Sequence, residues 1–516
     1  MNFARAIATV GGFTMLSRLT GFARDMLIAA FLGTGMVADA FFVAFKFPNL
    51  FRRLFAEGAF NAAFVPLFAG VLESEGPDAA RRFAEHAMAV LGWWLLAFVA
   101  LFEVVMPWAM LGFAPGFAED PAKLALTVEL TRITFPYLLF ISLVSLQSGV
   151  LNSMGKFAAA AATPVLLNLS LIAALIGLTP HLPGAGHALA VGTTIAGLAQ
   201  FAWLAISVRR AGVPLAPRLP RMTPRVGLLL RRIVPGAVGA GIYQVNLLVD
   251  TMIASLIGPG TVAVLFYADR IAQLPLGIVG VAIGTALLPL LSRQLRAGGM
   301  AEAAHSQNRA IEFALLLTVP AMAALVAIGE PLVMVLFQRG AFGPEQTRMT
   351  AEALAALSLG LPAYVLNKAL TPAFFAREDT ATPVKVAGVA MLANIVINLA
   401  LMKPLAHVGP ALATALSSWA NVALLAWLLR RHGHLAMDER LKRRLPRIVL
   451  SSAAMGGALW AASRYMAPLW AGGTAERALG LAALVGGGLA LFAALAHLSG
   501  AARVSDLKGM MRRTTP

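Results

Sequence analysis

The sequence contains no cysteine, and only 13% of its 516 residues are charged. The lack of cysteine excludes disulfides, thiolate nucleophiles and cysteine-ligated metals. A soluble protein is about 25% charged and about 45–50% apolar, whereas 59% of this chain is hydrophobic. No interval between the apolar runs is long enough for a soluble domain. We therefore expect an all-α polytopic membrane protein.

The motifs of nucleotide and metal sites are also missing. No GxxxxGK[ST] phosphate loop occurs, so the energy source is expected to be the membrane potential or an ion gradient. The eight histidines are scattered, mostly at the ends of expected spans, without the spacing of a metal site. We predict no metal and no cofactor, with Na⁺ or H⁺ as a candidate coupling ion.

The apolar runs predict about fourteen transmembrane helices. Their expected limits are 6–33, 36–70, 82–112, 126–151, 158–179, 186–208, 228–257, 261–292, 308–338, 350–374, 382–403, 408–430, 446–467 and 476–498. The net charge of +17 lies mainly in one alternating set of short loops, which the positive-inside rule assigns to the cytoplasm. Both termini are then cytoplasmic, and nucleic acid is not an expected partner.

The chain contains an internal repeat of six spans. The segment RDMLIAAFLGTGMVADAFFVAFKFPNL, from Arg24, resembles VDTMIASLIGPGTVAVLFYADRIAQLP, from Val249. Because six is even, the copies have the same orientation, as in known transporters with parallel repeats. We predict two pseudo-symmetric six-helix lobes plus two extra C-terminal helices. The predicted domains are 1–215, 216–435 and 436–516.

The first expected span carries the stretch SRLTGFARD, with two arginines and an aspartate. Charges inside a bilayer cost a few kcal/mol each, so a functional reason is expected. On a straight helix Arg18 and Asp25 share one face, Ser17 and Arg24 share a neighbouring stripe, and the two arginines are about 120° apart. Gly21 lies between them, and a bend there would turn both guanidinium groups into one cavity.

The second expected span continues the pattern of charge. Asp39 and Lys46 are seven residues apart, and Asn49 lies three residues before Arg52. Counted down from the turn at Gly33–Gly35, the cations of the two helices fall at two levels, roughly 15 and 25 Å deep. Asp39 is nearer the outer mouth than either level.

The second repeat tests whether the fold requires these charges. Aligning Asp25 with Asp250 leaves a tyrosine and a valine opposite Arg18 and Arg24. The repeated aspartates therefore look structural, whereas the arginines look functional. Arg270 follows the turn of the second repeat and lies near the upper cationic level.

The competing interpretation is that all of these charges are structural. Arg18 would then pair with Asp25, and Asp269 would pair with Arg270, because buried ions need partners. The asymmetry of the repeat favours ligand binding instead. Guanidinium groups match phosphate oxygens in bidentate geometry, so a pyrophosphate is the expected ligand. A drug exporter would be expected to show acidic groups there.

Four segments carry a resemblance to a known family: SRLTGFARD, ADAFFVAFKFPNLFRRLFAEGAFNAAFVPLF, YADRIAQLPLGIVGVAIGTALLPLLS and FFAREDTATPVK. The sequence resembles the MurJ/MviN family of lipid II flippases, within the multidrug/oligosaccharidyl-lipid/polysaccharide exporter superfamily. The likeness covers nearly the whole chain. It implies a transporter, not an enzyme, that flips undecaprenyl-pyrophosphate-linked peptidoglycan precursor (lipid II) to the periplasmic leaflet by alternating access. It also implies a bacterial inner-membrane location and a role in cell-wall synthesis and cell shape.

The resemblance also implies roles for individual residues. Substrate binding in a cationic central cavity is implied for Arg18, Arg24, Arg52, Arg270, Lys46, Asn49 and Ser17. Gating is implied for Asp39, Gly21 and Glu57. A sodium site is suggested at Asp250 and Asn367, although the neighbouring Thr371 is neutral where an acid is expected. The implied partners are lipid II and membrane lipids, with cell-wall synthesis proteins as further candidates.

Two alternatives remain at the level of the sequence. One is a related transporter, either a polysaccharide-precursor flippase or a drug/ion antiporter. The other is a membrane enzyme acting on polyprenyl-phosphate sugars, which needs carboxylates or histidines gathered at one membrane face. The few acids of the expected periplasmic loops are scattered, which argues against the enzyme.

Overall fold

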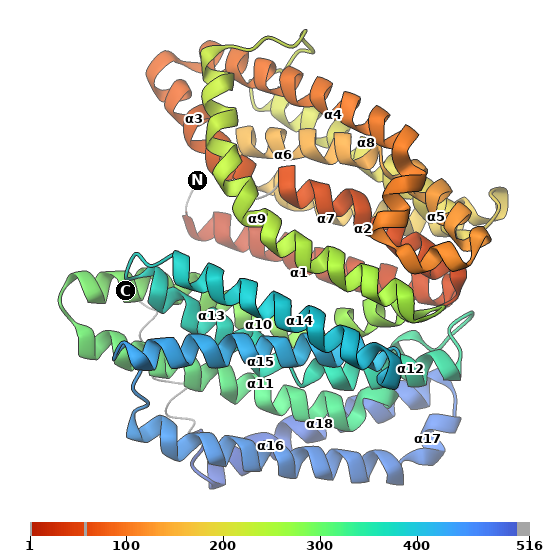
Figure 1. Cartoon of the computed structure of the whole chain (residues 1–516), viewed down its shortest axis with the longest axis vertical. Coiled ribbons are helices and arrows are strands. Elements are labelled where there is room, and N and C mark those ends of the chain that lie inside the picture. Colours follow the sequence, from red (N-terminus) through yellow and green to blue (C-terminus); the bar gives the residue numbers. More distant parts are fainter. Residues whose placement is uncertain (1–2, 56–58, 503–516) are drawn as a thin grey trace. The chain divides into compact units, whose positions relative to one another are not determined.

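The computed structural model describes residues 3–55 and 59–502. This part of the chain consists of α-helices and two short 3-10 helices, without a strand, which confirms the all-α prediction (Figure 1). The first helices are α1 (Phe3–Leu32), α2 (Met36–Phe55), α3 (Ala59–Glu75), α4 (Pro77–Phe113), η1 (Pro115–Glu119), α5 (Pro121–Thr134), α6 (Tyr137–Ser153), α7 (Ala158–Gly177), η2 (Thr179–His181), α8 (Ala185–Arg210) and α9 (Pro224–Ile257). The remaining helices are α10 (Thr261–Arg296), α11 (Met300–Phe337), α12 (Pro344–Ser358), α13 (Leu361–Phe375), α14 (Ala381–Leu405), α15 (Val408–Arg431), α16 (Glu439–Tyr465), α17 (Ala467–Ala471) and α18 (Thr474–Leu498).

Ten helical segments of the described residues are long and apolar enough to cross a membrane. Two of these segments, Pro121–Ser153 and Pro344–Phe375, are interrupted near their middle. The first interruption contains Pro136, whose nitrogen cannot donate a helical hydrogen bond. At the second, a Cβ on Gly360 would lie 3.0 Å from Cα of Ala415, so glycine is required by the approach of α15.

The chain divides into two compact units, Met1–Ala263 with Arg339–Phe342, and Val264–Gln338 with Gly343–Pro516. In the first unit α1 packs on α7, α7 on α8, α2 on α5, and α9 on α3. Phenylalanine rings form much of its core: Phe64 stacks with Phe60, Phe68 and Phe83 at centroid distances of 5.4, 5.7 and 5.7 Å.

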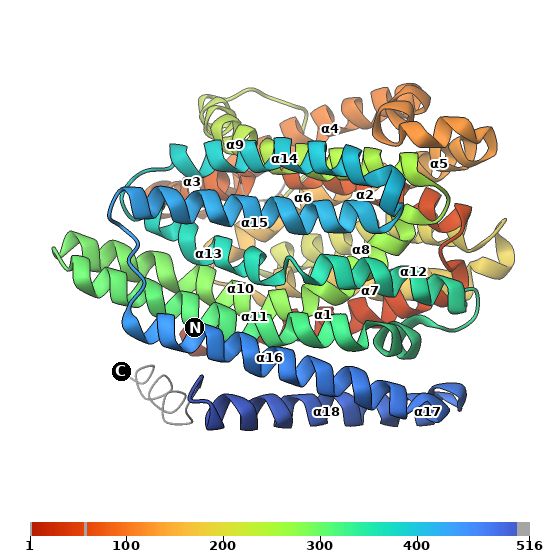
Figure 2. The same cartoon turned by 60° about the horizontal axis from the view of Figure 1, so that its bottom comes forward.

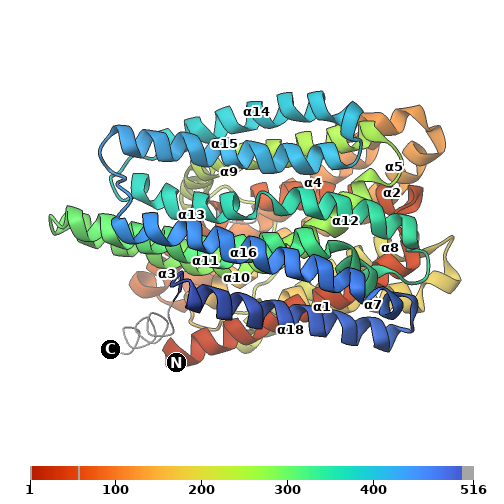
Figure 3. The same cartoon turned by 90° about the horizontal axis from the view of Figure 1, so that it is seen from below.

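In the second unit α11 packs on α13 and α16, and α14 packs on α15. Figure 2 shows α16 and α18 side by side, joined through α17 at one end. Figure 3 shows α14 and α15 running together along another edge of this unit. Leu459 of α16 and Leu484 of α18 are buried with Ile328 of α11, so the last two long helices share a core with α11.

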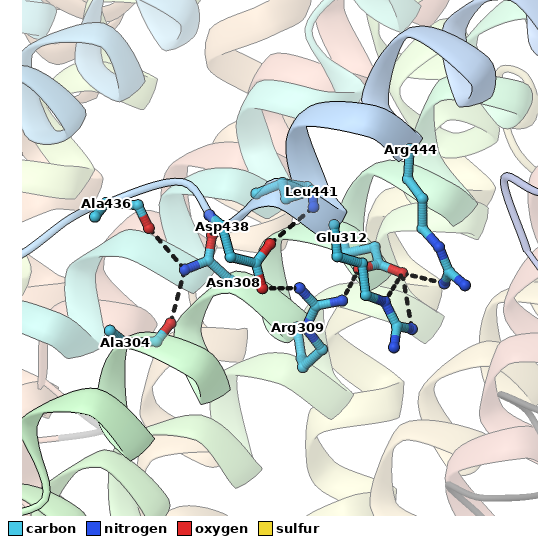
Figure 4. A network of polar contacts seen from close by, with 9 residues as sticks. Ala304, Asn308, Arg309, Glu312, Ala436, Asp438, Leu441 and Arg444 are labelled. Atoms are coloured by element: carbon cyan, nitrogen blue, oxygen red, sulfur yellow. Dashed lines mark hydrogen bonds and ion pairs between the residues drawn. The ribbon is translucent and has the colours of Figure 1, made fainter.

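An ionic network fixes the start of α16 on α11 (Figure 4). Glu312 of α11 accepts hydrogen bonds from Arg309 and from Arg444, the latter at 2.6 Å. Arg309 also pairs with Asp438, the N-cap residue of α16. Burial raises the pKa of Asp438, but the backbone amide of its helix and the Arg309 guanidinium hold that pKa below its usual value overall. The C-terminal helix pair is thus attached to α11 by charge as well as by packing.

Candidate functional site

Five charged residues that the sequence singled out lie on the two helices of one tight hairpin: Arg18, Arg24, Asp39, Lys46 and Arg52. The chain turns between α1 and α2 at Gly33–Gly35, and between α9 and α10 at Gly258–Gly260, as the sequence predicted. Gly33 has a φ of +59°, and a Cβ on it would lie 2.4 Å from the carbonyl oxygen of Ala341. Glycine is therefore needed there for both backbone conformation and close approach.

Arg24 is buried and neutralised by the residue that follows it. Its Nε and Nη2 donate to Oδ1 of Asp25 at 3.0 and 2.6 Å. Its Nη1 donates to Oδ1 of Asn168, on α7, at 2.8 Å. The arginine therefore holds α1 against α7, and Asp25 pairs with Arg24 and not, as the competing interpretation had it, with Arg18.

Asn168 also explains the glycine in the middle of α1. The helix continues through Gly21, so the bend considered from the sequence does not appear as a break in α1. A Cβ on Gly21 would lie 3.2 Å from Nδ2 of Asn168. The same Nδ2 donates to the carbonyl oxygen of Ser17 at 2.9 Å. In this structure the glycine therefore permits a close polar contact between α1 and α7.

Arg18 differs from Arg24 in its surroundings. Its side chain is exposed, and within the described residues it makes no hydrogen bond or ion pair. On α2, Arg52 donates through Nε to Oδ1 of Asn49 at 2.9 Å, and Asn49 is anchored by donating to the carbonyl oxygen of Phe45. Arg52 and Lys46 are both partly exposed.

Asp39 is fully buried near the start of α2 and joins three parts of the first unit. It accepts a hydrogen bond from Nζ of Lys123, on α5, at 2.7 Å. It also accepts from the backbone amides of Gly260 and Ala263 at 2.7 and 2.9 Å. These amides form the start of α10, where a carboxylate is favoured by the helix dipole. Asp39 therefore ties α2 to both α5 and the α9–α10 turn.

Lys123 is the member of this cluster that sequence reasoning missed. The lysine is buried, and its Nζ lies 4.0 Å from the centre of the Phe117 ring. From the sequence it looked like an ordinary loop cation in the segment APGFAEDPAK. Its isolation in a set of loops with few cations was the one available signal.

Arg270 belongs to the second unit and lies one helical turn after Phe266. Its guanidinium carbon is 4.8 Å from the centre of that ring, a cation–π contact. Asp269 is exposed and accepts a hydrogen bond from Gln273. Glu57 lies outside the described residues.

The two residues suggested for a sodium site lie in different units. Asp250 accepts from Nδ2 of Asn246 at 3.3 Å, within α9. Asn367 accepts from Oγ1 of Thr371 at 3.0 Å, within α13. Among the residues that the structure describes, no three acidic or histidine side chains are grouped as a metal site requires.

Comparison with known proteins agrees with this arrangement. A family model described as lipid II flippase MurJ matches residues 28–479. A probable lipid II flippase MurJ of Rhizobium meliloti (strain 1021) is 47% identical over 99% of this chain and 97% of its own length. A lipid II flippase MurJ of Burkholderia cenocepacia is 36% identical over 96% of each chain.

Solved structures show the same fold. A lipid II flippase MurJ in an inward closed conformation has a TM-score of 0.79 at 23% identity, covering 95% of this chain and 98% of its own. An inward-facing multidrug resistance MATE family transporter has a TM-score of 0.66 at 14% identity, covering 83% of this chain and 98% of its own. The protein therefore has a MurJ/MATE-like fold of a transporter and not of an enzyme, and the chain belongs to the lipid II flippase MurJ family.

Proposed function

We propose that this protein flips lipid II from the cytoplasmic to the periplasmic leaflet of the inner membrane by alternating access. Family membership supports the substrate, and the helical composition supports a membrane location. The proposed topology has fourteen spans with both termini in the cytoplasm. It comprises two six-helix lobes, 1–215 and 216–435, followed by helices of 436–516.

The observation that carries the proposal is the Arg18 guanidinium, which we call open because it is exposed and has no hydrogen-bond or ion-pair partner among the described residues. A charged side chain in the middle of an apolar helix is costly, and it is rarely left without a partner or water. Arg18 is exposed in α1 and has no counter-ion among the described residues. A diphosphate supplies the oxygens that a guanidinium binds in bidentate fashion.

The other predicted residues take separate parts in this proposal. Arg52, Lys46 and Asn49 of α2 would contact the diphosphate together with Arg18. Arg270 is the substrate-binding residue proposed for the second unit. Arg24 would join them after exchanging Asp25 for the substrate, with Ser17 beside it. Asp39, Gly21 and Glu57 would act in gating.

The energy source and partners are also proposed. Transport would be coupled to the membrane potential or to a gradient of Na⁺ or H⁺, with Asp250 and Asn367 as candidate ion-binding residues. Cell-wall synthesis proteins that use lipid II would act beside this protein.

Depletion of the protein in its host, with labelled lipid II followed across the membrane, tests the function. We expect lipid II to accumulate and to become inaccessible to a periplasmic probe. Exposure of lipid II at the normal rate after depletion would refute the proposal. Normal lipid II exposure with loss of another polyprenyl-linked polysaccharide would instead identify a related flippase.

A further inference from the structure

The linker between α8 and α9, residues 211–223, exposes two large apolar side chains. Leu219 is 79% exposed and Met222 is 65% exposed. The linker between α15 and α16, residues 432–438, differs in this respect, because its one leucine and its one methionine pack against a buried core. Exposed apolar side chains that lie together indicate a surface that contacts another partner or a membrane.

Arginines surround this linker, and no acid accompanies them in the chain. Residues 209–232 contain seven arginines and no aspartate or glutamate. Five of these arginines have exposed side chains that make no hydrogen bond or ion pair with the part of the chain that the structure describes: Arg209, Arg210, Arg221, Arg231 and Arg232. Their charge is therefore available to an anionic partner.

The other two arginines help to hold the linker in place. Glu85 of α4 is fully buried, and it accepts hydrogen bonds from the amide of Ala216 at 3.1 Å and from Arg218. Arg225, in the first turn of α9, pairs with Glu75 at the end of α3. The linker is thus fixed to the first unit at two points, and its exposed side chains are arranged before any partner binds.

The position of the linker corresponds to the expected cytoplasmic edge of the membrane. It joins the ends of α8 and α9 that the positive-inside rule assigns to the cytoplasm. In α9, Leu228 and Leu230 are 41% and 40% exposed. Leu228 lies about 6 Å along the helix from Pro224, the first residue of α9. Apolar surface that suits lipid therefore begins close to the end of the linker.

We propose that the linker and the five free arginines beside it form a surface that docks on the anionic phospholipid headgroups of the cytoplasmic leaflet. Leu219 and Met222 insert at the boundary between headgroups and acyl chains, while the arginines bind phosphates. Free cations combined with exposed apolar side chains are the features of an interfacial membrane-binding segment. Each arginine near an anionic surface strengthens binding about fivefold. The inference uses the proposed topology and does not depend on lipid II as the substrate.

The absence of cysteine allows a fluorophore to be attached at a single chosen residue. Leu219→Cys would carry an environment-sensitive label in the purified full-length protein. The nanodiscs would contain phosphatidylcholine, with or without phosphatidylglycerol, and lipids with a spin label near the top of one acyl chain, which quenches the fluorophore on contact. Ser74→Cys is the matched control, because this exposed residue lies beside Glu75 and therefore near the linker, but between acids.

We expect quenching of the Leu219 label to be several-fold stronger with phosphatidylglycerol than with phosphatidylcholine alone. High salt should reduce it, because salt screens the attraction between arginines and phosphates. The Ser74 label should be quenched little in either lipid. Quenching of the Leu219 label that is equal in both lipids, or no greater than that of the Ser74 label, would overturn the inference. Absence of quenching in both lipids would also overturn it and would favour an acidic protein as the partner.

Two double variants test the arginines in the Leu219-labelled protein. Arg209→Gln with Arg210→Gln removes two charges from the last turn of α8. Arg430→Gln with Arg431→Gln removes the same pair of residues from the last turn of α15, in the second unit. The first variant should weaken docking about tenfold or more, measured as the phosphatidylglycerol fraction that gives half-maximal quenching. The second should leave docking unchanged, and equal effects would contradict the proposed surface.

Discussion

The first hairpin of each repeat makes the same glycine turn with different charges. Aligned on their repeated aspartates, the hairpins have Arg24 opposite Val249 and Asp39 opposite Val264. The second repeat thus forms a helix pair and a turn with apolar residues at these positions. The hairpin itself therefore does not require the charges of the first repeat.

The repeated aspartates also have different surroundings. Asp25 is buried and paired with Arg24, in a helix that packs on α7. Asp250 is partly exposed and accepts from Asn246 of its own helix, α9, which packs on α3 and η1. The same residue type thus serves helix docking in one repeat and local hydrogen bonding in the other.

Both repeats also have a glutamate–histidine contact between helices, which we therefore interpret as structural. Glu129 and Glu352 occupy the ninth position of α5 and α12. Each contacts a histidine at the start of another helix: His187, in the first turn of α8, at 3.2 Å, and His407, the N-cap residue of α15, at 2.9 Å. Among the charges that the second repeat lacks, Arg24 and Asp39 are neutralised within the unit. Arg18 instead has no counter-ion among the described residues.

The largest loss of stability is expected from Asp39→Val, which copies the residue of the second repeat. The substitution leaves Lys123 as a buried charge without its carboxylate, which costs about 3–5 kcal/mol. Thermal unfolding of the purified protein measures the loss. The double variant Asp39→Val with Lys123→Met should recover much of it, and a double variant no more stable than the single one would contradict the pairing.

A smaller loss is expected from Arg24→Val, again copying the second repeat. Asp25 then keeps its charge in a buried position without the arginine, at a cost of about 3 kcal/mol. Adding Asp25→Asn should restore stability but not transport. If Arg24→Val unfolds like the wild type, the arginine does not dock α1 on α7.

Gly21→Leu should destabilise the protein less, by about 1–3 kcal/mol through overpacking against Asn168. Gly11 is a control in the same helix, because a Cβ there meets nothing within 4 Å. Gly11→Leu should leave the unfolding temperature unchanged or slightly raise it. Equal effects at both positions would show that α7 does not approach α1 at Gly21.

The sequence predicted the parts of the molecule that depend on local pattern. Apolar runs located the long helices, and glycines located both hairpin turns, because each needs only neighbouring residues. The contact between Asn49 and Arg52 also follows from helical spacing. The breaks at Pro136 and Gly360 were not predicted, since apolar periodicity continues through them.

Long-range partners could not be obtained in this way. Asn168 and Lys123 meet the first hairpin only after the helices have packed, and their own segments do not indicate which side chains they will contact. From the sequence alone, the comparison of the two repeats predicted that the repeated aspartates are structural and that Arg18 and Arg24 are functional. It could not show that Arg24 is neutralised while Arg18 is open, because both lie in the same helix.

Arg18→Ala tests the central claim most directly, because this variant should change transport without changing stability. Its side chain is exposed and has no partner among the described residues, so the unfolding temperature should match that of the wild type. Flipping of lipid II in proteoliposomes would be measured beside it, and we predict near-complete loss. Normal flipping by a normally folded Arg18→Ala protein would contradict the claim that an open guanidinium binds the diphosphate.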